Sequence, residues 1–557
     1  MNNEWWQKGT VYQIYPRSFN DTNGDGIGDI RGIIEKLDYL AKLGIDLLWL
    51  TPMYVSPQRD NGYDIADYFA IDPQYGTMAD FEELLEEAHR RGLKIMMDMV
   101  VNHTSYQHRW FQEALKGKDN PYRDYYIWKD PAADGGAPNN WLSKFSGSAW
   151  ELDEASGQYY LHLYEVSMPD LNWENPKLQE EIYQMMAWWG EKGIDGFRLD
   201  VINNISKSPD FPNDSLATAQ EDGRKFYVDG PHVHEYLHQM NRRIFDKYDL
   251  VTVGEMSSTT PEQCIKYTNP NRQELSMAFN FHHMKVDYPG GKKWASAKYR
   301  LTDLKRVMAE WQLKIAAGGG WNALFWTNHD QPRALARFAD DHVYREQSAK
   351  LLAIILFGLQ GTTYIYQGEE IAMTDANFTD ISQYDDAESR NAYKQMLTDG
   401  VSETDALHIL REKSRENARI PMQWNDETHQ GFTDGTPWLA PIHEDNWTAE
   451  KALANPDSIF YTYQRLIALR RGHAIFANGD FTLLDAASET IYDYERQWNG
   501  ETLLVVGNFS AEEQVWNLPE RHHDKKCQIL ESNYPHEAMT NKIVLQPYEA
   551  LMLHIKI

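Results

Sequence analysis

Four short apolar runs of this sequence end in carboxylates, accompanied by arginine and histidine. The residues concerned are, in chain order, Asp98, Asn102, His103, Arg198, Asp200, Glu255, His329 and Asp330. A single acid at such a place is more often a cap or a solvated side chain, but four acidic runs indicate one shared site. A carboxylate beside an arginine stays ionised, as a nucleophile must, whereas one in a drier position keeps its proton, as a general acid must. Two carboxylates with these different roles are typical of glycoside hydrolysis.

Eight apolar, β-branched or aromatic runs alternate with stretches of helical periodicity. They cover residues 11–16, 45–52, 93–103, 194–201, 250–256, 275–281, 322–330 and 362–370. Strands that alternate with helices form parallel βα units, and eight units predict an α/β fold, the closed (β/α)8 TIM barrel. The acidic runs are then strands three, four, five and seven, whose C-terminal ends meet at one mouth. Arg198 lies two residues before Asp200, so both side chains share one face of strand four.

Two segments depart from this alternation. Residues 104–171 are irregular and rich in aromatic residues, Gly, Asn and Pro, which predicts a subdomain inserted after strand three. From residue 480 to 557, short alternating runs predict a C-terminal antiparallel β-sandwich. The barrel would then comprise residues 1–103 and 172–479, with a helical excursion at 374–413 after strand eight.

The composition is that of an ordinary globular protein with a strong acidic balance. The 557 residues carry 54 Lys+Arg against 83 Asp+Glu, a formal net charge of -29. This charge argues against nucleic acid or an anionic membrane as a partner. The two cysteines, Cys264 and Cys527, predict packed, unreactive thiols rather than a disulfide framework. The sequence shows neither a secretory leader nor an apolar run of about twenty residues, so we expect a cytoplasmic protein, acting as a monomer.

The segment DTNGDGIGD, at 21–29, has the oxygen ligands and glycines of a cation-binding loop. The expected ligands are Asp21, Asn23, Asp25, the Ile27 carbonyl and Asp29. They predict a structural Ca²⁺ without a chemical role, and no organic cofactor. The loop is not an EF-hand, because Gly32 stands where a bidentate Glu is needed. A loop closed by Asx turns without metal is the alternative, and Mg²⁺ is another.

Five motifs together carry a resemblance to a known family. DMVVNH (98–103), GFRLDV (196–201), GEM (254–256) and TNHD (327–330) resemble, in order, four signature regions of the α-amylase family of retaining glycoside hydrolases, and MPDLN (168–172) resembles its fifth. The resemblance implies Asp200 as nucleophile, Glu255 as acid/base and Asp330 as transition-state stabiliser. It also implies that the nonreducing glucose is held by Tyr63, Asp64, His103, Arg198 and His329. Judged alone, either histidine would be a satisfied core residue, and we expect Asp98 to support Arg198.

Further stretches indicate which branch of this family the sequence resembles. QIYPRSFNDTNGDGIGD (13–29) and SRENARIPMQW (414–424) resemble the oligo-1,6-glucosidase branch, in which similar calcium loops occur. By this resemblance Arg415 lies near the cleavage point. Val201, directly after Asp200, resembles the residue of enzymes that accept linkages other than α-1,4.

A basic loop stands out in this acidic chain. FNFHHMKVDYPGGKKW, at 279–294, follows predicted strand six and places Lys285, Lys292 and Lys293 over the mouth. Gly290 and Gly291 allow a tight turn whose amides, with the lysines, would cradle a phosphate. From composition alone, a lysine pair is more often a solvated loop end.

The resemblance favours the phosphate. Together with GEMSST (254–259), NNISKSPDFP (203–212) and DGRKFYVDGPHVHEYLHQMNR (222–242), the basic loop resembles the trehalose-6-phosphate hydrolases of this family. Such enzymes cleave the α,α-1,1 bond of trehalose 6-phosphate to glucose and glucose 6-phosphate. The expected partner is therefore a small-molecule phosphorylated disaccharide.

Three other functions remain open. An oligo-1,6-glucosidase or α-glucosidase acting on unphosphorylated short sugars would use the same acids and differ only around the basic loop. A relative that transfers glucose to another sugar would differ in its products. A noncatalytic barrel that escorts a membrane partner is disfavoured by the complete set of acids.

Overall fold

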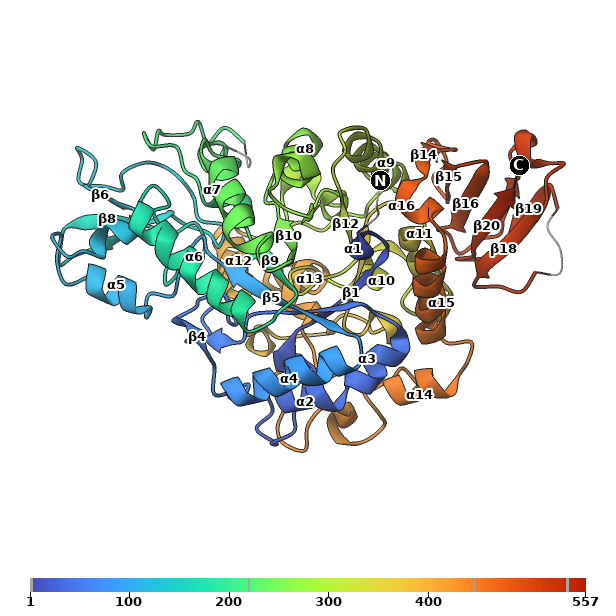
Figure 1. The fold of residues 1–557 in the computed structure, drawn as a ribbon, viewed down its shortest axis with the longest axis horizontal. Helices are drawn as coiled ribbons and strands as arrows, with labels where there is room; N and C mark the ends of the chain where they lie inside the picture. The colour runs from blue at the N-terminus through green and yellow to red at the C-terminus, as the bar shows by residue number, and fades with distance from the viewer. Residues whose placement is uncertain (1–3, 219–220, 445, 537–539, 557) are drawn as a thin grey trace.

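The computed structural model describes residues 4–218, 221–444, 446–536 and 540–556. Its centre is an eight-stranded sheet in the order β11–β10–β9–β5–β2–β1–β13–β12, with parallel pairing throughout. A parallel bridge between Ala278 and Asn322 joins the two outer strands and closes the sheet. The predicted TIM barrel is therefore confirmed (Figure 1).

Seven of the eight barrel strands fall within a predicted run, and β1 begins one residue before its run of 11–16. The strands are β1 (Thr10–Ile14), β2 (Leu47–Leu50), β5 (Lys94–Val100), β9 (Gly196–Asp200), β10 (Val251–Glu255), β11 (Met277–Phe279), β12 (Ala323–Leu324) and β13 (Thr362–Tyr366). Helices cover the outside and side chains fill the inside, so these strands are buried along nearly their whole length and are mostly apolar. Strand β12 is the shortest, because the chain leaves the sheet after Leu324 and the rest of its run is a loop toward the mouth.

The barrel is covered by helices with one apolar face. They include α2 (Ile30–Glu35), α3 (Leu37–Leu43), α4 (Met78–Arg90), α6 (Pro176–Glu191), α7 (Val233–Met240), α8 (Pro261–Thr268), α9 (Leu301–Ala317), α10 (Ala334–Phe338), α11 (Arg345–Phe357) and α15 (Ile459–Gly472). In α4, Phe81, Leu84 and Ala88 are buried at helical spacing, and a capping box of Thr77 with Asp80 starts the helix. Helix α11 is buried nearly all round because it packs between the barrel and the C-terminal sheet.

The segment after β5 forms a small body with its own core. It holds α5 (Arg109–Ala114) and a three-stranded sheet of β6 (Trp128–Lys129), β8 (Gln158–Leu161) and β7 (Trp150–Asp153). Its core includes Tyr227, from the loop after β9, and Trp141 stacks on Phe226 at 6.0 Å between ring centroids. Gly223 has φ +98 and a Cβ there would lie 2.4 Å from Trp141, so only glycine fits. The loop 222–228 thus belongs to this body, which the predicted bounds of 104–171 did not anticipate.

The C-terminal residues form the predicted antiparallel sheet domain, at the opposite end of the molecule from the insert (Figure 1). Five strands pair in the order β14 (Asp480–Leu483), β15 (Ile491–Trp498), β16 (Glu501–Asn508), β20 (Ala550–Lys556) and β18 (Cys527–Ser532). A second layer consists of β17 (Gln514–Asn517) and β19 (Lys542–Leu545). We did not predict β17, since of its four side chains only Trp516 is buried. Residues 537–539 and 557 of this predicted domain lie outside the described residues.

Several shorter elements complete the chain. They are α1 (Trp5–Lys8), β3 (Tyr54–Val55), β4 (Asp67–Ile71), α12 (Ala387–Thr398), α13 (Glu403–Lys413), α14 (Ala449–Ala454) and α16 (Ile475–Asn478). Helices α12 and α13 are the predicted excursion after strand eight. Cys264 is buried and Cys527 half-buried, and neither forms a disulfide. Within the described ranges, no helix has the length and apolar character needed to cross a membrane.

Candidate active site

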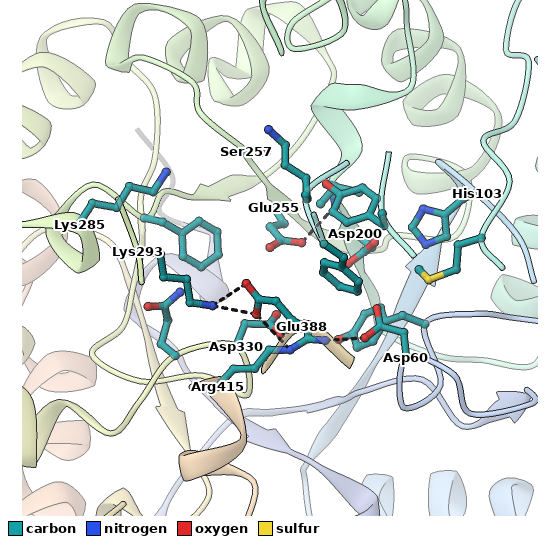
Figure 2. Close-up of a pocket in the computed structure, with 18 residues that line it drawn as sticks. Asp60, His103, Asp200, Glu255, Ser257, Lys285, Lys293, Asp330, Glu388 and Arg415 are labelled. Atoms are coloured by element: carbon teal, nitrogen blue, oxygen red, sulfur yellow. Dashed lines mark hydrogen bonds and ion pairs between the residues drawn. The ribbon is translucent and has the colours of Figure 1, made fainter. Parts of the chain in front are cut away.

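The C-terminal ends of β5, β9 and β10 and the loop after β12 open into one pocket (Figure 2). Eight of the predicted site residues line it: Tyr63, His103, Asp200, Glu255, Lys285, Lys293, Asp330 and Arg415. Four others do not line it: Asp64, Arg198, His329 and Lys292. In Figure 2 the lysines lie across the acids from His103, so one cavity has an acidic floor and a basic side.

A single guanidinium organises the floor of the pocket. Arg198 Nη1 donates to Asp200 Oδ1 at 2.6 Å and to Asp98 Oδ1 at 2.8 Å, while its Nη2 donates to Glu255 Oε2 at 2.6 Å. The predicted support of Arg198 by Asp98 is therefore present. Arg198 is 1% exposed, so it binds Asp200 and Glu255 from beneath and leaves their outer faces to the cavity.

Burial and this shared arginine determine the protonation of the two acids. Burial raises the pKa of Asp200 to about 7, opposed by Arg198. Burial raises the pKa of Glu255 to about 8, and Arg198 opposes this while the nearby Asp200 and Asp330 add to it. Two acids this close lose their protons in steps that belong to the pair. The order, with Asp200 ionising before Glu255, is the one that a nucleophile and a general acid require.

Asp330 is ionised for a different reason. Burial alone would raise its pKa, but the surrounding charges hold the pKa well below its ordinary value. Burial lowers the pKa of His329 well below its ordinary range, so that ring is neutral. The cations that lower the pKa of Asp330 are therefore Arg415, at 3.2 Å, and Arg419, at 3.0 Å from its Oδ1, together with Arg198.

His329 and Tyr63 form a stacked pair in the pocket wall. The two rings are 5.3 Å apart and 7° from parallel, and the Tyr63 hydroxyl lies 2.6 Å from His329 Nε2. The same hydroxyl donates to Asp98 Oδ2 at 2.9 Å. The Gln13 side-chain amide nitrogen lies 2.7 Å from His329 Nδ1, so both ring nitrogens of His329 have hydrogen-bond partners within the protein. Tyr63 lines the cavity and separates His329 from it.

His103 is placed differently. It is 1% exposed, lines the pocket, and has a pKa lowered to about 4 by burial. Its Nε2 has no hydrogen-bond partner among the described residues. A buried polar atom without a partner is costly, so this nitrogen is available to a hydroxyl group in the cavity.

Asp64 lies behind the pocket wall, and Asp60 lies in it. The Asp64 carboxylate accepts the Ser56 hydroxyl and the backbone N–H groups of Arg59 and Asp60, at 2.9 to 3.1 Å, and so stabilises its own loop. Asp60 lines the cavity and accepts from Arg415 Nη2 at 2.6 Å. Sequence reasoning missed Asp60, although it stands four residues before Asp64 in the same turn.

The predicted basic loop reaches the pocket only in part. Lys285 and Lys293 line it, whereas Lys292 is exposed outside it. Lys293 Nζ donates to both carboxylate oxygens of Glu388 at 2.8 Å. Glu388 comes from α12 and also lies 3.5 Å from Arg415 Nε. The charge of Lys293 is therefore already paired.

Two more charged residues of the pocket lining were missed. Lys144 comes from the insert, and Glu388 comes from the polar excursion after strand eight. Neither lies in a recognised motif: Lys144 is a single lysine in a polar and aromatic stretch, and Glu388 lies in the first turn of α12, so no sequence signal singled them out.

The residue after Asp200 adopts a strained backbone. Val201 has φ 36 and ψ 40, a left-handed conformation that a β-branched residue rarely adopts. This conformation directs its backbone N–H to Glu255 Oε2 at 3.2 Å. The turn after β9 thus carries a second donor to Glu255.

The predicted calcium segment forms a loop of Asx turns. Asp21 accepts the backbone N–H groups of Asn23, Gly24 and Gly26 at 2.8 to 3.0 Å, and Asp29 caps α2 through the Gly32 N–H. In the described part of the chain, no group of three or more His, Cys, Asp or Glu residues could by itself hold a metal ion. The further amide and carbonyl oxygens of Asn23 and Ile27 suit a hard cation, so Ca²⁺ at this loop stays a prediction.

Known proteins match the whole chain. A family model described as alpha amylase, catalytic domain, matches residues 13–479, and one described as the alpha-amylase SusG C-terminal domain matches residues 491–552. The chain is 53% identical to the trehalose-6-phosphate hydrolase of Bacillus subtilis (strain 168), over 99% of this chain and 98% of that protein. It is 50% identical to the oligo-1,6-glucosidase of Parageobacillus thermoglucosidasius, over the full length of both.

Solved structures agree with these relatives. The crystal structure of Bacillus licheniformis trehalose-6-phosphate hydrolase matches with a TM-score of 0.94 and 54% identity, over 100% of both chains. An isomaltulose synthase from Erwinia rhapontici NX5, in complex with sucrose, matches with a TM-score of 0.96 and 39% identity, again over 100% of both. With its barrel, its C-terminal sheet domain and these full-length relatives, the chain belongs to the α-amylase family and is a glycoside hydrolase.

Proposed function

We propose that this enzyme hydrolyses the α,α-1,1 bond of trehalose 6-phosphate to glucose and glucose 6-phosphate. The similar identities of the trehalose-6-phosphate hydrolase and oligo-1,6-glucosidase relatives, 53% and 50%, do not decide between the two activities. The observation that carries the proposal is a pocket with an acidic floor and lysines on one side, in a chain with a net charge of -29. A neutral disaccharide needs no cations there, whereas a phosphorylated one does.

The reaction is a retaining double displacement. Glucose binds in the deep part of the pocket, where His103 Nε2, Asp60 and the ionised Asp330 meet its hydroxyl groups. The 6-phosphoglucose half extends toward the lysines. Asp200 attacks the anomeric carbon while Glu255 gives its proton to the bridging oxygen, and glucose 6-phosphate leaves.

The second half-reaction reverses the role of Glu255. Now ionised, Glu255 takes a proton from water, which attacks the anomeric carbon and releases α-glucose from Asp200. Arg198 contacts both acids throughout, so it keeps Asp200 a carboxylate at the start and at the end. The phosphate is remote from the bond broken and supplies binding and orientation.

The test compares kcat/KM for trehalose 6-phosphate, trehalose and isomaltose at one pH and ionic strength, with glucose 6-phosphate measured as product. We expect trehalose 6-phosphate to be preferred by more than about a hundredfold, the effect of one or two charge-assisted contacts. An NMR assay of the first glucose released should show the α-anomer. A ratio near one with rapid isomaltose hydrolysis would refute the proposal.

That result would favour oligo-1,6-glucosidase activity. The pairing of Lys293 with Glu388 is the observation that fits it, since a lysine neutralised by a carboxylate suits a pocket for a neutral sugar.

A further inference from the structure

A buried lysine lies behind the pocket wall, in the loop after β9. Lys207 stands seven positions after Asp200, and its side chain is only 3% exposed. Its Nζ donates to Asn102 Oδ1 at 2.7 Å and lies 2.8 Å from Asp170 Oδ2. Neither half of the double displacement uses this ammonium group. It joins the loop that follows the nucleophile to the loop after β5 and to the end of the insert.

The side-chain amide of Asn102 is held in one orientation. A lysine ammonium group only donates hydrogen bonds, so the atom of Asn102 that faces Lys207 must be the carbonyl oxygen. The Nδ2 group of Asn102 then donates to Asp170 Oδ2 at 3.0 Å and lies 3.2 Å from His103 Nδ1. The Asp170 carboxylate only accepts, which agrees with this orientation. Lys207 and Asp170 together therefore exclude the flipped amide.

The orientation of the amide decides which ring nitrogen of His103 carries the proton. Burial lowers the pKa of His103 to about 4, an effect that Asp170 opposes and Lys207 increases, so the ring is neutral. A neutral imidazole has one N–H group and one acceptor nitrogen. Nδ1 faces the N–H of Asn102 and must accept, so the proton is on Nε2. This is the nitrogen without a partner among the described residues, on a ring that lines the pocket (Figure 2).

The backbone holds the members of this network side by side. His103 and Asp170 form an antiparallel bridge, and the Leu171 N–H donates to the Asn102 carbonyl at 2.9 Å. The other oxygen of Asp170, Oδ1, accepts the Leu163 N–H at 2.8 Å. The segments are therefore fixed by the main chain, and the direction of the Asn102 amide is set by the side chains around it.

We infer that Lys207 is a positioning residue of the active site. Through the Asn102 amide it holds His103 as the Nε2–H tautomer, which donates a hydrogen bond to a hydroxyl group of the glucose in the pocket. Lys207 does not line the pocket itself, so it acts only through its neighbours. The inference rests on the proposed function only in placing glucose beside His103, and it applies to any α-glucoside.

The first measurement is the tautomer of His103. NMR of enzyme labelled with ¹⁵N-histidine should show an unprotonated Nδ1 and a protonated Nε2, on the signals that disappear in His103→Ala. Asn102→Asp keeps the shape of the side chain but presents only acceptor oxygens, so it should place a proton on Nδ1. A wild-type ring protonated on Nδ1 alone, or an Asn102→Asp ring without a proton on Nδ1, would overturn the inference.

Kinetics show whether Lys207 acts through this contact. The substrates are 4-nitrophenyl α-glucoside and its monodeoxy derivatives. The derivative on which wild type and His103→Ala have equal kcat/KM identifies the hydroxyl group that His103 binds. Lys207→Met should lower kcat/KM about tenfold for the glucoside, the effect of one hydrogen bond, and less than about twofold for that derivative. Equal losses on both substrates would mean that Lys207 has a structural role only.

Two further variants are matched controls. Lys207→Arg keeps a donor-only cation beside Asn102, so it should retain most of the rate and the Nε2–H signal. Lys305 is also a buried lysine, but it lies outside the pocket and donates at 2.6 to 2.9 Å to the carbonyl groups of Asp485, Ser488 and Ile491. Lys305→Met should lower the Tm and leave both rates unchanged. The same substrate-dependent loss in Lys305→Met would attribute the effect to destabilisation and overturn the inference.

The possible failures are distinguishable. The wild-type and Asn102→Asp tautomers decide the inference even where Lys207→Met does not fold. An enzyme without preference for trehalose 6-phosphate refutes the proposed function, whereas the tautomer of His103 tests this inference alone.

Discussion

At the floor of the pocket three carboxylates contact one arginine, whereas at its mouth two cations contact one carboxylate and a third cation lies close by. Asp98, Asp200 and Glu255 all contact Arg198. At the mouth, the Asp222 carboxylate contacts Lys144 and Arg224, and Lys285 lies close to Lys144. Each region therefore has a surplus of about two charges of one sign, in partly or fully desolvated surroundings.

The two regions relieve this surplus in different ways. The floor is closed, so its surplus negative charge is relieved by a proton, and the pKa of Glu255 rises to about 8. The mouth is open, so its surplus positive charge can be relieved by an anionic ligand. The comparison teaches that surplus charge in desolvated surroundings favours a bound proton where it is negative and a bound anion where it is positive.

The largest effect should come from the nucleophile. Asp200→Asn keeps the shape of the side chain but removes the attacking carboxylate, so we expect kcat to fall by about 10⁴-fold or more on every substrate. Steady-state assays with trehalose 6-phosphate and with a neutral aryl glucoside, 4-nitrophenyl α-glucoside, measure this. Equal losses on both place Asp200 in the floor, and activity within tenfold of wild type would contradict its role.

The rate loss on replacing the acid/base residue should depend on the leaving group of the substrate. Glu255→Gln removes the proton donor, and we expect a loss of about 10²- to 10⁴-fold with trehalose 6-phosphate. An aryl glucoside with an acidic leaving group needs less protonation, so its glycosylation step should slow much less. Burst kinetics would resolve the two steps. Identical losses in both glycosylation rates would argue against Glu255 as the acid.

The pH profile reports the floor directly. Activity requires an ionised Asp200, whose pKa is raised to about 7, and a protonated Glu255, whose pKa is raised to about 8. Rates should therefore fall as pH decreases through the first value and as pH rises through the second. We expect kcat/KM for the neutral glucoside to be bell-shaped with a narrow maximum between them. A flat profile down to about pH 5 would show that Arg198 lowers the pKa of Asp200 more strongly.

The contact between Glu388 and Lys293 offers a smaller test of the mouth. Glu388→Gln removes a negative charge near the incoming phosphate and releases Lys293. The ratio of kcat/KM for trehalose 6-phosphate over trehalose should rise by about two- to fivefold, the size of a partly exposed ion pair. A fall in the ratio would mean that Glu388 binds the phosphorylated sugar.

The loop at 21–29 lies apart from both regions and should affect stability alone. Bound Ca²⁺ should raise the free energy of unfolding by about 2.7 kcal/mol at a Ca²⁺ concentration of one hundred times Kd. The Tm should therefore rise with Ca²⁺ concentration. The preference for trehalose 6-phosphate should not change when EDTA is added. Asp21→Ala should abolish the Ca²⁺ dependence, and a Tm independent of Ca²⁺ would refute the site.

Local patterns were sufficient for the barrel and for the acids of the floor. Each of the eight predicted runs overlaps a barrel strand, because a strand covered on both faces is mostly apolar and can be predicted without knowledge of its neighbours. The shared location of the acids could be predicted because they lie at the C-terminal ends of strands, and parallel strands present these ends at one mouth. Asp60 and β17 were missed because a turn residue and a half-exposed strand carry little periodicity.

The sequence by itself determined the barrel, the family and the acids of the floor, since these depend on short segments with strong patterns. Only the tertiary structure decided which charges are paired. Folding pairs Lys293 with Glu388 and directs the Asp64 carboxylate toward the backbone of its own loop. It also brings Lys144 into the same pocket as Lys285, which lies 141 positions later in the chain. Charges act through space in desolvated surroundings, so the function of a lysine depends on the partners that folding places beside it.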